Sequence, residues 1–252
     1  MKKYFLAVAS FFIYSHISLG QVYPGQMDST FVPVRSHHYD PELTFDFCVN
    51  EPAWSNQAGI HSAFGSTDRL YFRKEVPVNH DNDLSSSYST TVWRGERANA
   101  QILVWSSEAL EQVRVSTQDL RSAEGNIIPK DRITFELVRY VLSNYPYAEK
   151  KAICGESPYK SGFLMPDRFE TLDRFDLPSQ TTRPVWMMVD VPRGTAPGTY
   201  KGQVEVRAKG KAPQLLNLEI VVQNQLLPYP KDWKYRLDLW QNPWAVAWYN
   251  HV

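Results

Sequence analysis

Strict alternation of apolar and polar residues is the feature that most limits the fold of this chain. It is clearest over residues 199–207. The alternate positions there that predict a buried face are Tyr200, Gly202, Val204 and Val206. A period of two places successive side chains on opposite faces of a β-strand. The segment is therefore predicted to be a strand with one buried and one solvated face.

The same pattern recurs along the chain. It is found over residues 98–105, 133–141, 185–191 and 215–222, and in the third of these Trp186, Met188 and Asp190 stand opposite the buried set. Pro197 and Gly198 predict a type II turn before residue 199, because proline fixes the first central φ and glycine accepts a positive second one. Only residues 107–112 and 166–173 suggest short helices. Closely spaced strands with Gly and Pro turns predict an all-β fold, a β-sandwich.

Residues 1–20 are predicted to be a signal peptide. Lys2 and Lys3 precede an apolar run over residues 4–17, and Ser18 and Gly20 are the small residues that a signal peptidase inspects. The run is too short to cross a bilayer, which takes roughly 20 apolar residues. We therefore expect an exported protein, periplasmic or extracellular, without a membrane-spanning segment.

The rest of the chain divides into three parts. Residues 21–88 contain scattered prolines and are predicted to be an irregular segment that packs on the sandwich, with a few short strands. Residues 89–227 are predicted to form the sandwich itself. Residues 228–252 are interpreted as a linker and the first strand of a second domain, which the family resemblance given below implies is a truncated (β/α) barrel. Because a lone strand cannot bury a core, we expect further chain after Val252.

Composition excludes some partners and leaves others open. Basic and acidic residues number 27 each, so the concentrated basic surface that nucleic acids and anionic membranes require is not expected. Aromatic residues make up 13% of the chain and suit either a β core or stacking against sugar rings. Cys48 and Cys154 are compatible with a disulfide after export and equally with two unpaired thiols.

Metal and cofactor chemistry is not predicted. His37 and His38 are close in sequence to Asp40 and Glu42, and residues 80–83 contain Asp and Asn residues as a calcium-binding loop does. Neither stretch has the converging ligands or the spacing of a metal site, so solvated turns are the better interpretation. The chain also has no Gly-x-Ser-x-Gly, phosphate-loop or Cys-x-x-Cys motif, which argues against esterase, nucleotide and redox functions.

Three groups of segments, in order, resemble a known family. They are residues 93–104 with 110–115 and 125–128, residues 183–192 running into 196–202, and residues 237–244. Together they are similar to the amino-terminal sandwich domain, and then the first strand of the catalytic barrel, of glycoside hydrolase family 123 and its relatives. The resemblance covers most of the chain from about Ser89 onward.

This resemblance implies an exo-acting β-N-acetylgalactosaminidase in which an adjacent Asp-Glu pair carries the chemistry. The 2-acetamido oxygen of the substrate attacks the anomeric carbon, the Glu protonates the leaving oxygen and the Asp orients the acetamido group. The present sequence has no Asp-Glu dipeptide and no two neighbouring acidic residues. Barrel active sites are also assembled from loops after several strands. We therefore predict no catalytic residue in this chain.

If residues 237–240 form the first barrel strand, the side chains near its carboxyl end are candidate substrate contacts. They are Asp238, Trp240, Gln241 and Trp244. The alternative is that the two tryptophans wedge the sandwich against the barrel. We expect the chain to be the non-catalytic part of a secreted glycoside hydrolase, whose partner is an amino-sugar glycan bound through an associated barrel domain, with no cofactor. The alternative is an autonomous carbohydrate-binding or structural sandwich.

Overall fold

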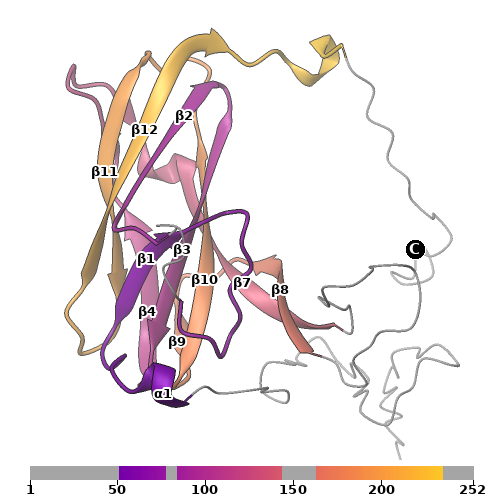
Figure 1. Ribbon diagram of the computed structural model, residues 1–252. Coiled ribbons are helices and arrows are strands. Elements are labelled where there is room, and N and C mark those ends of the chain that lie inside the picture. The colour runs from indigo at the N-terminus through magenta and orange to yellow at the C-terminus, as the bar shows by residue number, and fades with distance from the viewer. Residues whose placement is uncertain (1–50, 78–83, 144–162, 235–252) are drawn as a thin grey trace, which may run out of the picture.

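Two β-sheets face each other in this protein, as the computed structural model in Figure 1 shows; the structure describes residues 51–77, 84–143 and 163–234. One sheet has five strands, in the order β1 (His61–Gly65), β3 (Arg97–Ser106), β10 (Thr181–Asp190), β7 (Ile133–Ser143) and β8 (Phe163–Glu170). The other has the order β2 (Ser87–Arg94), β12 (Gln214–Leu226), β11 (Gly198–Arg207), β4 (Leu110–Thr117) and β9 (Phe175–Leu177). In addition, the short strand β5 (Leu120–Arg121) pairs with β11, and β6 (Ile127–Ile128) pairs with β5. The two sheets form a sandwich, in which β2 and β12 are parallel.

Helical structure in the described ranges is limited to short pieces. They are α1 (Glu51–Trp54) and two 3₁₀ turns, η2 (Lys130–Arg132) and η3 (Pro230–Asp232). The predicted all-β class is therefore confirmed, and no helix in these ranges is long and apolar enough to cross a bilayer. The two helix suggestions are wrong, because β4 begins at Leu110 and β8 continues to Glu170. Pairing of β4 with β11 and of β8 with β7 outweighs a weak local preference for helix.

The predicted alternation is confirmed in β11 and β12. Tyr200, Val204 and Val206 are fully buried, whereas the intervening Lys201 and Gln203 are exposed. Residues from both sheets meet in one core, among them Ile102, Val104, Val185, Met187 and Val189 from one sheet and Val113, Tyr200, Val204, Leu218 and Ile220 from the other. Each fully buried Val, Leu or Ile side chain contributes roughly 1.5–3 kcal/mol to folding.

The turn before β11 differs from the prediction. The N–H of Thr195 donates to the carbonyl of Pro192 at 3.0 Å, so the hydrogen-bonded turn lies over residues 192–195. Gly198 has a φ of 152°, instead of the value of about 80° that a type II turn requires, and it begins β11. The strand starts earlier than expected because Gly198 already pairs with Val222 of β12.

The outer face of the five-stranded sheet is covered over part of its area. Gln101 and Leu103 of β3 point away from the core and are nevertheless buried. The chain that follows β1 lies over them, because the Gln101 amide nitrogen donates to the carbonyls of Ser66 at 2.7 Å and Arg69 at 3.2 Å. Tyr140 of β7 is fixed on the same face. Residues of β3 and β10 beyond this cover remain accessible.

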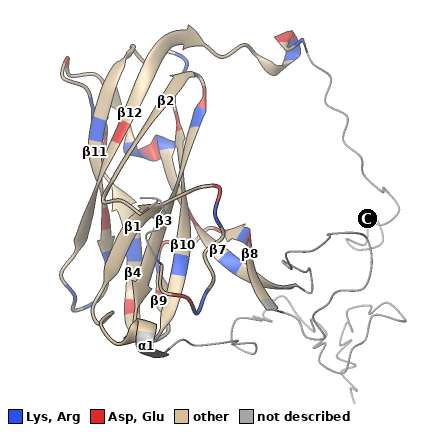
Figure 2. Ribbon diagram, viewed as in Figure 1, with Lys and Arg blue, Asp and Glu red and all other residues tan. Residues whose placement is uncertain are grey.

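Charged residues are mixed over the sandwich. In the view of Figure 2, basic and acidic positions are scattered over both sheets, and neither sign gathers over one of them. Many of them form cross-strand or local ion pairs at the surface, such as Lys201 with Glu219 and Arg114 with Asp173. Among the described residues, the charges on the face seen in Figure 2 are therefore not of the one-signed kind that attracts a polyelectrolyte.

Candidate functional site on the outer face of the five-stranded sheet

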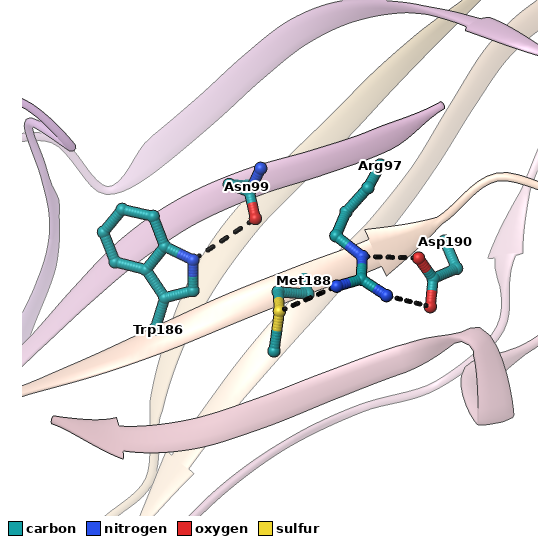
Figure 3. A network of polar contacts seen from close by, with 5 residues as sticks. All are labelled: Arg97, Asn99, Trp186, Met188 and Asp190. Atoms are coloured by element: carbon teal, nitrogen blue, oxygen red, sulfur yellow. Dashed lines mark hydrogen bonds and ion pairs between the residues drawn. The ribbon is translucent and has the colours of Figure 1, made fainter. Parts of the chain in front are cut away.

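The accessible half of the outer face carries a group of side chains from β3 and β10. The register pairs Arg97 with Asp190 and Asn99 with Met188. Trp186 lies two residues before Met188 on β10, on the same face. Directly paired residues of antiparallel strands share one face, so these five side chains lie together, as Figure 3 shows. With Phe169 of β8, whose ring contacts Trp186, they are called the β3–β10 patch below.

An ion pair forms one end of the patch. Arg97 Nε lies 2.6 Å from Asp190 Oδ1, and Arg97 Nη2 lies 3.1 Å from Asp190 Oδ2. This two-point contact holds both planar groups in one orientation and raises the pKa of Arg97. The remaining guanidinium nitrogen, Nη1, contacts the sulfur of Met188 at 3.6 Å. Because both side chains are about half exposed, the pair contributes little to stability.

Two aromatic rings form the other end of the patch. The centroids of the Phe169 and Trp186 rings are 5.7 Å apart, and the ring planes are inclined by 31°. Phe169 is 51% exposed, and Trp186 is partly accessible. The two rings thus form an aromatic pair that is at least partly accessible to solvent, placed by the pairing of β7 with both β8 and β10.

Asn99 lies between the ion pair and the aromatic rings of the patch. Its Oδ1 accepts a hydrogen bond from Trp186 Nε1 at 3.2 Å, and its backbone carbonyl accepts one from the Tyr88 hydroxyl at 2.7 Å. These contacts fix the amide so that its nitrogen is turned away from the indole in Figure 3. On the β7 side, Glu136 pairs with Trp186 and accepts a hydrogen bond from the Thr171 hydroxyl at 3.1 Å.

The chemistry available to these side chains is binding. The six residues of the patch include no histidine, cysteine or serine that could act as a nucleophile, and the carboxylate of Asp190 is held by Arg97. Amide, carboxylate and guanidinium groups can form hydrogen bonds, and the rings can stack against a flat apolar surface. No group of three or more His, Cys, Asp and Glu that could hold a metal ion occurs in residues 51–77, 84–143 or 163–234.

Apolar side chains also gather around the end of β12. Leu226 and Tyr229 are 42% and 53% exposed, and Trp233 is 38% exposed. The Trp233 indole donates to the carbonyl of Pro228 at 3.1 Å, and the Leu227 N–H donates to the carbonyl of Arg94 at 3.0 Å. The segment that leaves the sandwich is thus ordered by contacts of its own and with the β2–β3 turn.

The site residues proposed from the sequence lie elsewhere in the chain. Residues outside the described part include Asp238, Trp240, Gln241, Trp244, Cys48 and Cys154, as well as the histidine stretches at 37–38 and 80–83. The described ranges therefore do not test these predictions. They stay predictions.

Sequence reasoning missed the patch although half of it was visible. Trp186, Met188 and Asp190 occupy the side of the 185–191 alternation that predicts a solvated face. Large apolar side chains at solvated positions are a signal for an interaction surface. Their partners Arg97 and Asn99 come from a strand almost 90 residues earlier, as the separation of 87 between Asn99 and Trp186 shows, and only the register identifies them.

Comparison with known proteins identifies the family to which the sandwich belongs. A family model described as the glycoside hydrolase 123 N-terminal domain matches residues 64–208. A family 123 glycoside hydrolase from Clostridium perfringens, solved in a study of glycolipid glycan hydrolysis, aligns with a TM-score of 0.62 and 20% identity, over 77% of this chain and 32% of that chain. The resemblance deduced from the sequence is confirmed, and the alignment spans about a third of the clostridial enzyme.

A human protein domain is also among the solved structures that align with the chain. PapD-like domain 7 of human CEP192 aligns with a TM-score of 0.34 and 12% identity, over 72% of this chain and 94% of that chain. No curated protein matches the chain.

Proposed function

This chain belongs to the glycoside hydrolase 123 family, whose N-terminal domain it contains, and from this we propose that it is the non-catalytic N-terminal part of a secreted glycoside hydrolase resembling β-N-acetylgalactosaminidases. The observation that carries the proposal is the extent of the two matches. The family model covers residues 64–208 and describes an N-terminal domain, and the structural alignment covers 32% of the clostridial chain. In such an enzyme the chemistry belongs to the remaining part.

The acidic residues support the same assignment. The family resemblance implies an adjacent Asp-Glu pair, and none of the 27 acidic residues of this sequence has an acidic neighbour. Within the described ranges, the carboxylates with a clearly altered pKa are Glu108, Glu124 and Glu219, and all three are lowered. A general acid needs a pKa raised toward neutrality, so none of these carboxylates is suited to protonating a leaving group.

The proposal extends to the two ends of the chain, of which the structure describes only residues up to 234 at the C-terminal end. Residues 1–20 would direct export, and residues 228–252 would be the linker and first strand of the catalytic barrel. Asp238, Trp240, Gln241 and Trp244 would then be candidate contacts to an amino-sugar glycan at the carboxyl end of that strand. Support for this part is the resemblance of residues 237–244 to the family's first barrel strand.

The experiment is a hydrolysis assay of the purified chain with an aryl N-acetyl-β-galactosaminide. We expect no turnover above the buffer rate, whereas a typical enzyme turns over about 10 substrate molecules per second. A family 123 enzyme with its adjacent acid pair, assayed in parallel, is the positive control, and circular dichroism of the chain verifies that the β-fold is present. Turnover at an enzyme-like rate would refute the proposal.

Export has a separate readout. In a bacterial host, we expect the chain in the periplasm or medium with Gln21 as its first residue, determined by mass spectrometry of the intact protein. Retention of residues 1–20 in a cytoplasmic product would contradict this part of the proposal and leave the assignment of the sandwich untouched.

A further inference from the structure

The β3–β10 patch is accessible for a structural reason. Gln101 and Leu103, on the same face of the same strand, are covered by the chain that follows β1. The cover ends before Asn99, so Asn99, Trp186 and Met188 remain partly accessible on this face. A sheet that hides one half of its outer face and exposes aromatic rings on the other half is expected to use the exposed half for binding.

The charges of the patch are compensated within it. Arg97 and Asp190 form a two-point ion pair. Glu136 is the remaining acid, and the Thr171 hydroxyl donates to it. A charged ligand would have to compete with these contacts. A neutral ligand would meet their outward donors and acceptors without breaking them.

The shape of the patch specifies the ligand further. The Phe169 and Trp186 rings, with centroids 5.7 Å apart, are two neighbouring and at least partly accessible aromatic rings on which a ligand ring can stack. Asn99 has its oxygen engaged by the indole N–H, and in the described part of the chain no acceptor is hydrogen-bonded to its Nδ2. A ligand that fits therefore has an apolar face and hydroxyl groups around its edge.

We propose that the β3–β10 patch is a non-catalytic binding site for a neutral pyranose ring. The ring stacks on Phe169 and Trp186, and its hydroxyls accept from Asn99 Nδ2 and donate to the carboxylate of Asp190. This inference goes beyond the proposed function, because it assigns sugar binding to the sandwich itself. It does not depend on a barrel, since all residues of the site lie on β3, β8 and β10.

The test is a calorimetric titration of the full chain with methyl N-acetyl-β-galactosaminide, and with methyl β-galactoside for the same ring without the acetamido group. We expect saturable binding with a Kd of about 1 mM, as suits a small ligand on an open surface. Because the charges are compensated, the affinity should hardly change when salt is raised. Galactose 6-phosphate should bind no more tightly than the neutral sugars.

Two variants locate the site. Phe169→Ala removes half of the stacking surface and is expected to weaken binding at least about fivefold, the low end of what stacking on an aromatic side chain contributes. Asn99→Ala removes the amide donors and should also weaken binding. The matched control is Leu215→Ala, because Leu215 is 52% exposed and lies on β12 of the other sheet. It should leave the affinity unchanged.

The outcomes are distinct. Saturable binding that Phe169→Ala weakens and Leu215→Ala does not would support the site. Absence of saturation with both sugars, or equal affinity of Phe169→Ala and the unaltered chain, would overturn it and favour a patch that is covered by another protein domain. Thermal unfolding of each variant separates loss of binding from loss of fold. The hydrolysis assay is an independent readout, so either proposal can fail alone.

Discussion

Arg193 and Tyr229 join the link between β10 and β11 to the chain that follows β12. The Arg193 guanidinium carbon lies 3.9 Å from the centroid of the Tyr229 ring, and Arg193 Nη1 donates to the carbonyl of Leu227 at 2.5 Å. Gly95 leaves room for the arginine stem, since a Cβ at Gly95 would lie 2.9 Å from Arg193 Cγ. This contact fixes where the segment to η3 leaves the sheets in Figure 1.

Arg193→Ala should release this segment. The variant loses a cation–π contact and a hydrogen bond to Leu227, together worth about 1 kcal/mol at a partly exposed site. We expect amide hydrogen exchange over residues 226–234 to become roughly fivefold faster, with little change in the sheets. Arg207→Ala, which removes a surface pair with Glu205, is the control. Equal exchange rates over residues 226–234 in both variants would show that the contact of Arg193 with Tyr229 and Leu227 does not hold this segment.

Gly202→Ala should destabilise the sandwich. A Cβ at Gly202 would lie 2.4 Å from Leu120 Cδ2, and Leu120 is fully buried on β5, which pairs with β11. Overpacking of this kind costs about 1–3 kcal/mol, measured as a shift of the denaturation midpoint in urea. Gly194→Ala is the matched control, because a Cβ there meets no atom within 4 Å. Similar midpoints for both variants would contradict the prediction.

Tyr200→Phe tests the buried end of the turn before β11. The Tyr200 hydroxyl donates to the carbonyl of Ala196 at 2.8 Å, and the side chain is fully buried in the core. Losing this bond should lower the free energy of unfolding by about 1 kcal/mol. Tyr229→Phe keeps its ring beside Arg193 and, being exposed, should change stability little. If both variants unfold at the wild-type temperature, the hydrogen bond contributes nothing.

Low pH should weaken the ion pair between Lys201 of β11 and Glu219 of β12. The hydrogen bonds from Lys201 and then Ser89 lower the pKa of Glu219 below its ordinary value of 4.5. A lowered folded-state pKa stabilises the fold above the unfolded value, and this stabilisation is lost as the pH falls through the folded value. Glu219→Gln should therefore lose less stability than wild type between neutral pH and pH well below 4.5.

The size of this effect should be small and sensitive to salt, because the side chains of the pair are 71% and 33% exposed. Urea denaturation at the two pH values, repeated in high salt, measures it. Equal losses for wild type and Glu219→Gln at low salt would exclude Glu219 as a contributor to acid sensitivity.

The sequence by itself determined the fold class and the core strands. Alternation over residues 199–207 predicted which side chains are buried, and the structure buries Tyr200, Val204 and Val206. It also supported the family, through segments whose roles the structure explains: Gly202 is a point of close approach and Tyr200 a hydrogen-bonded core residue. These features are local, because a strand's period of two is set by its own backbone.

Tertiary structure decided what covers each face and which strands meet. It placed a strand where residues 107–112 suggested helix, moved the turn from Pro197 to residues 192–195, and buried the outward Leu103 under a distant segment. It also assembled the β3–β10 patch, in which Arg97 and Asp190 are 93 residues apart. Local periodicity carries no information about such pairs, because register arises from hydrogen bonds and packing between segments far apart in the chain.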